Sequence, residues 1–268
     1  MRVWIASLIF YSFIYAFCEL FRFLLRRGVF RIPQQYVELA NEFIGTVQVC
    51  APMFDVNIIL EHYGLKGVLI EITFIELVNA LVLRDARADP CPLVSRKLNC
   101  NNSGVKILSF IKKQISLQKL GTFILTQFSA AYFSYLLVLV FWRLGVHSIH
   151  RRVAEKNCES DLAVTLLYGS LVEAGGCLVS KFAEVYMEPR INEKFLSFCG
   201  ALLAGILTVL GIHLTGMYAN PIVAWACTFN CGEATHLYHF IVYWLAPMSA
   251  WLLADRYLHV EQEHTKEE

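Results

Sequence analysis

Asn220-Pro221-Ile222 lies 131 residues after a similar motif, Asp89-Pro90-Cys91 (220 − 89). Two glutamates inside apolar runs, Glu42 and Glu173, are separated by the same distance (173 − 42), and each begins a Glu-x-x-Gly sequence. Each Asx-Pro motif follows its glutamate by 47 residues (89 − 42 and 220 − 173). This fixed offset predicts two copies of one structural unit, each with a short helix that begins at Asx-Pro.

The composition indicates a membrane protein. Of the 268 residues, 57% are hydrophobic and the mean hydropathy is +0.51, which is too apolar for an ordinary soluble domain. The formal net charge is only +1, so the chain lacks the basic surface of a nucleic-acid-binding protein. The nine cysteines lie mostly in apolar segments without the spacing of metal ligands. We therefore expect no metal, no cofactor and no nucleic-acid partner.

Seven apolar runs are long enough to cross a bilayer, which takes about 20 residues for a ~30 Å hydrocarbon core. They cover residues 3–25, 36–60, 66–84, 119–143, 163–187, 195–216 and 236–257. Two shorter helical stretches are expected near 90–99 and 221–230, each about half a membrane long at ~1.5 Å per residue. Such half-helices are tolerated in a bilayer only where they are buried in protein or line a water-filled cavity.

The predicted fold is an all-α membrane protein with an inverted repeat of six transmembrane helices and two half-helices. Residues 1–34 are expected to hold an extra N-terminal hydrophobic helix and a basic linker. Residues 35–257 would form the channel domain, with copies at about 35–143 and 163–257, and residues 258–268 a charged tail. Each copy has three spans, an odd number, so the copies insert in opposite orientations and the half-helices meet near the midplane.

Positive charges predict the orientation in the membrane. Arginine and lysine follow the first run and surround the first half-helix, so both regions and the C-terminal tail are expected in the cytoplasm. The sequon Asn101-Asn102-Ser103 would then remain unused. Run 3–25 is either a signal peptide or a retained anchor, and Glu19 and Arg22 inside it favour the anchor. Loop 144–162 carries mixed charge and is expected to be solvated.

Asn220 and Asp89 are both suited to cap a helix, with proline at the first helical position, where an N–H is not needed. At the centre of a bilayer, the amide of Asn220 can also donate to a water oxygen. The positive ends of two facing helices orient water and repel cations. Asp89 places an acid where the second motif has an amide, and the sequence leaves its ionisation state open.

Glu42 and Glu173 are predicted to support the half-helices. A carboxylate inside a span is costly and by default functional. Each can accept hydrogen bonds from the irregular backbone that precedes a half-helix, because those N–H groups need acceptors. The alternative is a glutamate at a helix end near the membrane interface.

These motifs together resemble those of the aquaporin (major intrinsic protein) family over about residues 35–257. Asp89-Pro90-Cys91, Cys231 (nine residues after Ile222) and the segment 240–247 are similar to the unorthodox "superaquaporin" branch. The resemblance implies a homotetramer with a pore in each subunit, which passes water and small neutral solutes. It also implies residence in an intracellular membrane such as the endoplasmic reticulum.

Four positions correspond to the selectivity filter of that family: Thr208, Met217, Val223 and, in span 66–84, Leu69. Val223 stands where the family usually carries arginine, and Thr208 where water-selective members carry histidine. An uncharged filter is expected to admit glycerol or hydrogen peroxide more readily than a tight water filter does.

Three functions compete. The first is a passive channel. The second is a non-conducting aquaporin-fold protein with a structural or organising role, which the departures at Asp89, Ile222 and Val223 motivate. The third is an intramembrane enzyme, which is disfavoured because no His, Cys or Glu recurs at a catalytic or metal spacing. Cys231 is interpreted as a redox or oligomer-contact thiol, or as a packing residue.

Overall fold

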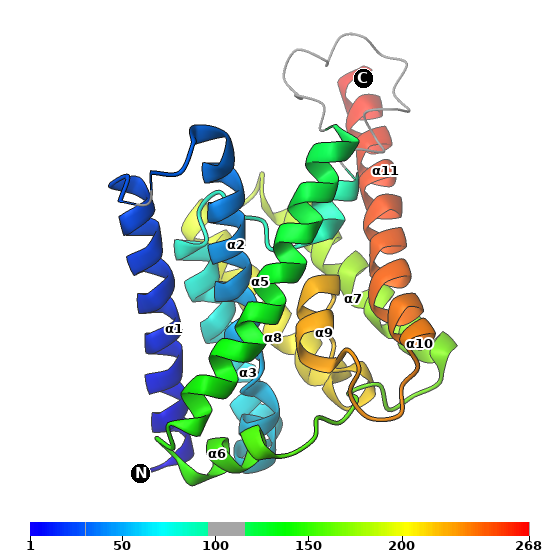
Figure 1. Ribbon diagram of the computed structural model, residues 1–268. Helices are drawn as coiled ribbons and strands as arrows, with labels where there is room; N and C mark the ends of the chain where they lie inside the picture. The colour runs from blue at the N-terminus through cyan, green and yellow to red at the C-terminus, as the bar shows by residue number, and fades with distance from the viewer. Residues whose placement is uncertain (30, 96–115, 268) are drawn as a thin grey trace.

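The structure is a computed structural model that describes residues 1–29, 31–95 and 116–267, and all regular elements within these ranges are helices. The long helices form a bundle with the two chain termini at opposite ends (Figure 1). They are α1 (Val3–Arg26), α2 (Gln34–Met53), α3 (Val56–Val82), α5 (Leu117–Arg143), α7 (Leu166–Met187), α8 (Glu193–Thr215) and α11 (Ala246–Glu267). The shorter elements are α6 (Ser148–Glu155), α9 (Pro221–Thr228), α10 (His236–Phe240) and the π-helix η1 (Ile241–Leu245).

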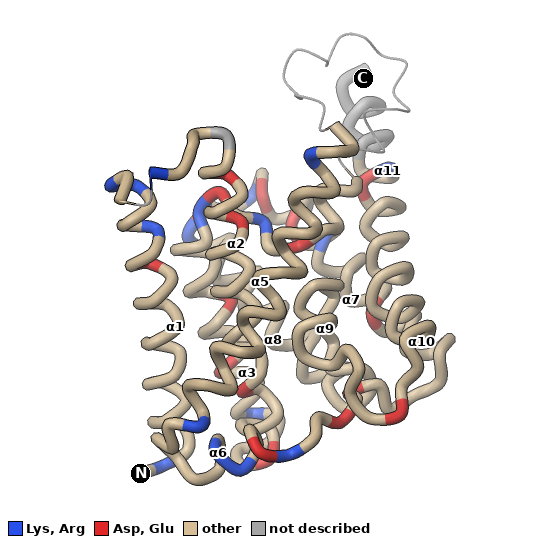
Figure 2. The backbone as a smooth tube through the Cα atoms, in the orientation of Figure 1, with Lys and Arg blue, Asp and Glu red and all other residues tan. Residues whose placement is uncertain are grey.

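Several helices are long and apolar enough to cross a membrane. Within the described ranges these are Val3–Arg26, Leu117–Arg143, Glu193–Thr215 and His236–Leu258. The helices α2, α3 and α7 are also long, but each buries a carboxylate, namely Glu42, Glu71 and Glu173. Lysine and arginine gather towards the two ends of the bundle, and its middle is mostly uncharged (Figure 2). This distribution is typical of a protein that spans a bilayer.

The junction of α2 and α3 differs from the predicted one. The helix α2, which corresponds to the expected span 36–60, ends already at Met53. The next helix, α3, begins three residues later at Val56. The intervening Asp55 is fully buried and binds side chains of other helices, which fixes the turn at this point. Gly64, with φ 64° and ψ −164°, interrupts the helical geometry inside α3. Only glycine adopts such a conformation without strain.

The N-terminal helix α1 is part of the bundle and is joined to it by buried polar contacts. Nη1 of Arg22, which is 3% exposed, donates to Gln48 Oε1 on α2 at 2.6 Å and to the Val82 carbonyl on α3 at 3.1 Å. The hydroxyl of Tyr11 donates to Asp55 Oδ2 at 2.7 Å and also bonds Glu71 on α3. Buried polar groups bonded in this way fix the position of one helix against another.

The expectation that loop 144–162 is simply solvated is wrong for its first half. Residues 148–155 form α6, whose His150 is 2% exposed and bonds Asp55 Oδ1 through Nε2 at 2.7 Å. The buried carboxylate of Asp55 needs a polar partner, and α6 supplies it. Residues 156–165, which connect α6 to α7, are not helical and are called the strap below.

Two short helices begin in the interior. The helix α9 lies between the long helices (Figure 1), and residues 90–95 are also helical. The remainder of the stretch 90–99 and the sequon at 101–103 lie outside the described residues.

Candidate functional site

Asn220 forms the N-cap of α9. Its Oδ1 accepts the backbone N–H groups of Ile222 at 3.0 Å and Val223 at 3.4 Å, and Pro221 occupies the first helical position. These bonds satisfy two of the donors that a helix start leaves without partners. The cap therefore fixes both the starting point and the direction of α9.

Asp89 acts in the same way on the first short helix. Its Oδ1 accepts the backbone N–H of Cys91 at 2.8 Å, Pro90 begins the helix, and both Pro90 and Cys91 are buried. The carboxylate therefore replaces the amide as a cap without changing where the helix begins.

The two motifs meet in space. Nδ2 of Asn220 donates to the backbone carbonyl of Ala88 at 2.9 Å, across a sequence separation of 132 residues. An amide NH₂ carries two hydrogens, so Asn220 can bind Ala88 and still offer a second donor to a solute. The bond places the starts of the two short helices next to each other.

Glu42 and Glu173 bind equivalent backbone groups before the two short helices. Glu42 accepts the N–H groups of Arg87 at 3.0 Å and Ala88 at 2.8 Å. Glu173 accepts those of Tyr218 at 3.2 Å and Ala219 at 2.7 Å. Additional donors are Gln127 Nε2 for Glu42, at 2.8 Å, and Thr215 Oγ1 for Glu173, at 2.6 Å. Both glutamates are almost fully buried, so these bonds are shielded from water.

The backbone next to each motif is strained in the same way. Ala88 has φ 53° and Ala219 has φ 47°, and the two residues are again 131 apart (219 − 88). A left-handed conformation at a residue other than glycine costs roughly 1–2 kcal/mol. The glutamate bonds to the same two N–H groups hold this conformation in place.

The glycines of the two Glu-x-x-Gly sequences allow these loops to approach, but they face different neighbours. A Cβ on Gly45 would lie 2.2 Å from Ala86 Cβ, which cannot rotate away. A Cβ on Gly176 would instead meet the flexible end of Met217, with Cε at 2.0 Å. We therefore expect the two sites to tolerate alanine differently.

Gly45→Ala is expected to lower the free energy of unfolding by roughly 1–3 kcal/mol, as overpacking does in well-packed interiors. Gly176→Ala should lower the free energy of unfolding by less, because Met217 can change rotamer and because alanine has a higher helix propensity than glycine. Thermal unfolding in detergent measures both. Gly175→Ala is the control, because no atom lies within 4 Å of its added Cβ. Equal losses at Gly45 and Gly176 would contradict this account.

The four predicted filter positions have different environments. Thr208 lines a narrow cavity together with Met53, Val56, Asn57, Ile212, Gly216 and Tyr218. Met217 lies against Gly211 and Gly176, and Val223 belongs to an apolar cluster with Ile222 and Tyr243. Leu69 is half-buried and approaches Gly205 on α8. Thr208 is thus the member of this set that lines the described cavity.

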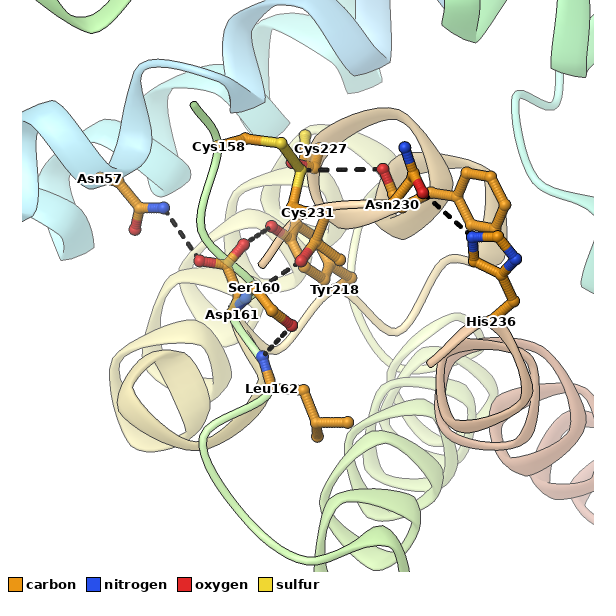
Figure 3. Close-up of a disulfide and its surroundings, with 12 residues drawn as sticks. Asn57, Cys158, Ser160, Asp161, Leu162, Tyr218, Cys227, Asn230, Cys231 and His236 are labelled. Atoms are coloured by element: carbon orange, nitrogen blue, oxygen red, sulfur yellow. Dashed lines mark hydrogen bonds between the residues drawn. A yellow bond between two sulfur atoms is a disulfide. The ribbon is translucent and has the colours of Figure 1, made fainter. Parts of the chain in front are cut away.

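Cys231 forms a disulfide with Cys158 in the strap, so its interpretation as a free redox, oligomer-contact or packing thiol is corrected (Figure 3). Backbone bonds run alongside the disulfide. Gly232 N donates to the Cys158 carbonyl at 3.2 Å, and Ala163 N donates to the Leu214 carbonyl at 2.9 Å. The strap is therefore tied both to the segment that follows α9 and to the end of α8.

Asp161 lies in the middle of the strap and binds both sides of the narrow cavity. Its Oδ1 accepts a hydrogen bond from Nδ2 of Asn57 at 3.0 Å, and its Oδ2 accepts a hydrogen bond from the Tyr218 hydroxyl (Figure 3). Its backbone N–H donates to Thr228 Oγ1 on α9 at 3.0 Å. Burial raises the pKa of the Asp161 carboxyl above its usual range, and the bonds from Tyr218 and Asn57 oppose this change.

The site residues predicted from the sequence do not include Cys158, Asp161, Asn57 or Tyr218. A signal for the disulfide was available. Cys158 lies in a charged loop outside the apolar runs, and the predicted topology places that loop and the end of the second half-helix on the same side. No comparable signal marked Asp161, because its partners come from distant segments.

Comparison with known proteins extends over most of the chain. No family model matches it. Aquaporin-11 of Milnesium tardigradum is 22% identical over 248 residues, which cover 90% of this chain and 82% of the relative. Aquaporin-11 of Equus caballus is 28% identical over 243 residues, covering 85% and 81%, and that of Homo sapiens is 25% identical over 214 residues, covering 79% and 74%.

The predicted resemblance is confirmed by these comparisons. Homology to aquaporins implies an aquaporin fold, in agreement with the all-helical bundle and its candidate membrane spans. The relatives that it matches are aquaporins, which are channels and not enzymes, in agreement with the expectation that the chain is not an enzyme. Over most of its length the chain is therefore homologous to aquaporin-11 proteins of the superaquaporin branch, at 22–28% identity.

Proposed function

We propose that the protein is a passive transmembrane channel for water and small neutral solutes. The observation that carries the proposal is the bond from the Asn220 amide to the Ala88 carbonyl, which joins the starts of two short helices inside the bundle. Two helix N-termini at one point create a positive potential that repels cations and orients water. The homology to aquaporin-11 supports the same function.

We further propose that the channel is an inverted repeat of six spans and two half-helices, with α1 as an additional helix. The equivalent contacts of Glu42 and Glu173 support the repeat, because each glutamate binds the two residues that precede its own Asx-Pro motif. In this role the two glutamates position the half-helices and do not contact the solute.

The four predicted filter positions are proposed to form an uncharged lining, with Thr208 at its narrow part and with contributions from Leu69, Met217 and Val223. Permeability of proteoliposomes to water, glycerol and hydrogen peroxide tests the solute class. Flux of at least one of these solutes above that of protein-free liposomes is expected. Flux at the protein-free level for all three would instead favour the alternative, a non-conducting protein with a structural or organising role.

Asp89→Asn is expected to change proton or ion leak more than water flux. The amide can accept the Cys91 N–H as the carboxylate does, so the short helix should keep its start. The substitution removes an ionisable group next to the positive helix ends, which should strengthen the barrier to cations. Proton flux and water flux in the same liposome preparation measure the effect, and an identical leak in both proteins would contradict it.

We propose that the protein resides in an intracellular membrane such as the endoplasmic reticulum and assembles as a homotetramer. The resemblance to the superaquaporin branch implies the first point, and the disulfide supports an oxidising environment for the strap, because disulfides persist on the oxidising side of a membrane. The strap would then face the lumen, and the end of the bundle that holds the C-terminus would face the cytoplasm (Figure 1). Light scattering of the purified protein in detergent tests the tetramer, and a mass other than that of four subunits would exclude it.

A further inference from the structure

We propose that Asp161 is a specificity-determining residue that sets the width of the narrow cavity and restricts passage to neutral solutes of about the size of water and hydrogen peroxide. This inference rests on the proposed channel function. It adds to the predicted filter a residue from the strap, a segment outside both short helices.

Asp161 bridges two walls of the cavity. Asn57 belongs to the first turn of α3, and Tyr218 belongs to the loop that leads into α9. Both line the cavity, and both donate to the Asp161 carboxylate. A carboxylate bonded to both walls keeps them at a fixed separation, because a wider opening would break at least one bond.

A third wall residue lies close to Asp161 as well. A Cβ on Gly216 would be 3.3 Å from Asp161 Cβ and 2.6 Å from the Tyr218 ring, so these side chains fill the space beside this turn. Gly216 has φ 81°, a conformation that glycine adopts without strain. Asp161 therefore lies directly behind three residues that line this end of the cavity, namely Asn57, Gly216 and Tyr218.

The strap holds Asp161 in place independently of these bonds. The disulfide fixes residue 158, the bond to Thr228 fixes the backbone at 161, and the bond to Leu214 fixes residue 163. Three anchors within six residues leave the side chain little freedom to move away. This preorganisation is what a selective constriction requires.

The chemistry of the walls indicates the class of solute. Asn57, Thr208 and Tyr218 contribute uncharged polar groups, whereas Met53, Val56 and Ile212 contribute apolar ones. The acidic group at this end disfavours anions. Small neutral molecules that form hydrogen bonds fit such walls, and a narrow opening slows glycerol more than water or hydrogen peroxide because glycerol is larger.

The test compares the ratio of glycerol to water permeability in proteoliposomes. Asp161→Ala removes the bridge and is expected to raise this ratio several-fold over that of the wild type. Asp161→Asn can still accept from Asn57 and contact Tyr218, so its ratio should stay near the wild-type value. Asn57→Ala, at an exposed position, should raise the ratio to a smaller extent because one of the two wall contacts is lost.

Glu159→Ala is the matched control, since it removes an exposed acidic residue from the same strap. Thiol labelling shows whether the Cys158–Cys231 disulfide, and with it the strap, remains in place in each variant. If Asp161→Ala conducts water but has the same ratio of glycerol to water permeability as the wild type, the role of Asp161 is overturned and the channel function remains intact. Equal increases in Asp161→Ala and Asp161→Asn would also overturn it. Absence of water flux in both wild type and Asp161→Ala would overturn the channel function itself.

Discussion

Glu173→Ala is expected to lower the free energy of unfolding by more than about 3 kcal/mol and to abolish solute flux. The substitution leaves three donors without their acceptor, namely the N–H groups of Tyr218 and Ala219 and the hydroxyl of Thr215. Each buried donor without a partner costs roughly 1–3 kcal/mol. Ala219 would also lose the bond that holds its strained backbone. Thermal unfolding in detergent and stopped-flow water permeability measure the two effects.

The equivalent substitution Glu42→Ala should behave in the same way, because Glu42 accepts from Arg87, Ala88 and Gln127. The controls are Glu184→Ala and Glu38→Ala on the same two helices. Those side chains are 56% and 53% exposed and pair with Lys181 and Lys119, so the loss of these solvent-exposed carboxylates should have little effect. If all four substitutions had similar effects, the proposed support of the short helices by Glu42 and Glu173 would have to be abandoned.

Cys231→Ser is expected to destabilise the protein by about 4 kcal/mol, the loop-closure entropy of a crosslink that spans 73 residues. The strap would be released at its first anchor, and a shift in mobility on a non-reducing gel would report the lost crosslink. The free energy of unfolding follows from denaturation under non-reducing conditions.

Cys158→Ser should destabilise the protein to the same extent. The double variant should be no less stable than either single variant, because all three lack the same bond. Cys199→Ser, at a free and half-buried cysteine, is the control. A strong effect of Cys231→Ser together with a silent Cys158→Ser would mean that Cys231 acts through something other than this disulfide.

Much of the fold could be predicted because its signals are local. The expected span 195–216 and half-helix 221–230 correspond to α8 (Glu193–Thr215) and α9 (Pro221–Thr228). Asn220 and Pro221 form a helix start from adjacent residues, and Gly216 ends α8 in a left-handed conformation. Such signals depend on the residue types of one short segment, so they can be recognised without knowledge of the fold.

Other features depend on contacts between distant segments and were missed. Asp55 ends the predicted span 36–60 early because it binds Tyr11 and His150, which lie 44 and 95 residues away. The pairing of Cys158 with Cys231 is one of many that nine cysteines allow, and spacing alone does not select it. That crosslink also helps to hold Asp161 in place, because Cys158 lies in the same strap. The sequence showed where the helices begin, but not which loop residues close the cavity between them.

The position of α1 also depends on contacts between distant segments. Glu19 and Arg22 suggested a retained helix, but their partners could not be inferred. In the structure, Arg22 reaches Gln48 on α2 and Glu19 binds Arg84 in the turn that follows α3. A helix fixed by these bonds is a structural part of the bundle.

The activation energy of water permeation through proteoliposomes tests the channel function most directly. Water that moves in single file past the starts of two short helices avoids partition into hydrocarbon. The activation energy of the wild type is therefore expected to fall well below that of protein-free liposomes of the same lipid, and Glu173→Ala should return it to the lipid value. A wild-type activation energy equal to that of the bare lipid would contradict the account and leave a non-conducting aquaporin-11 homologue.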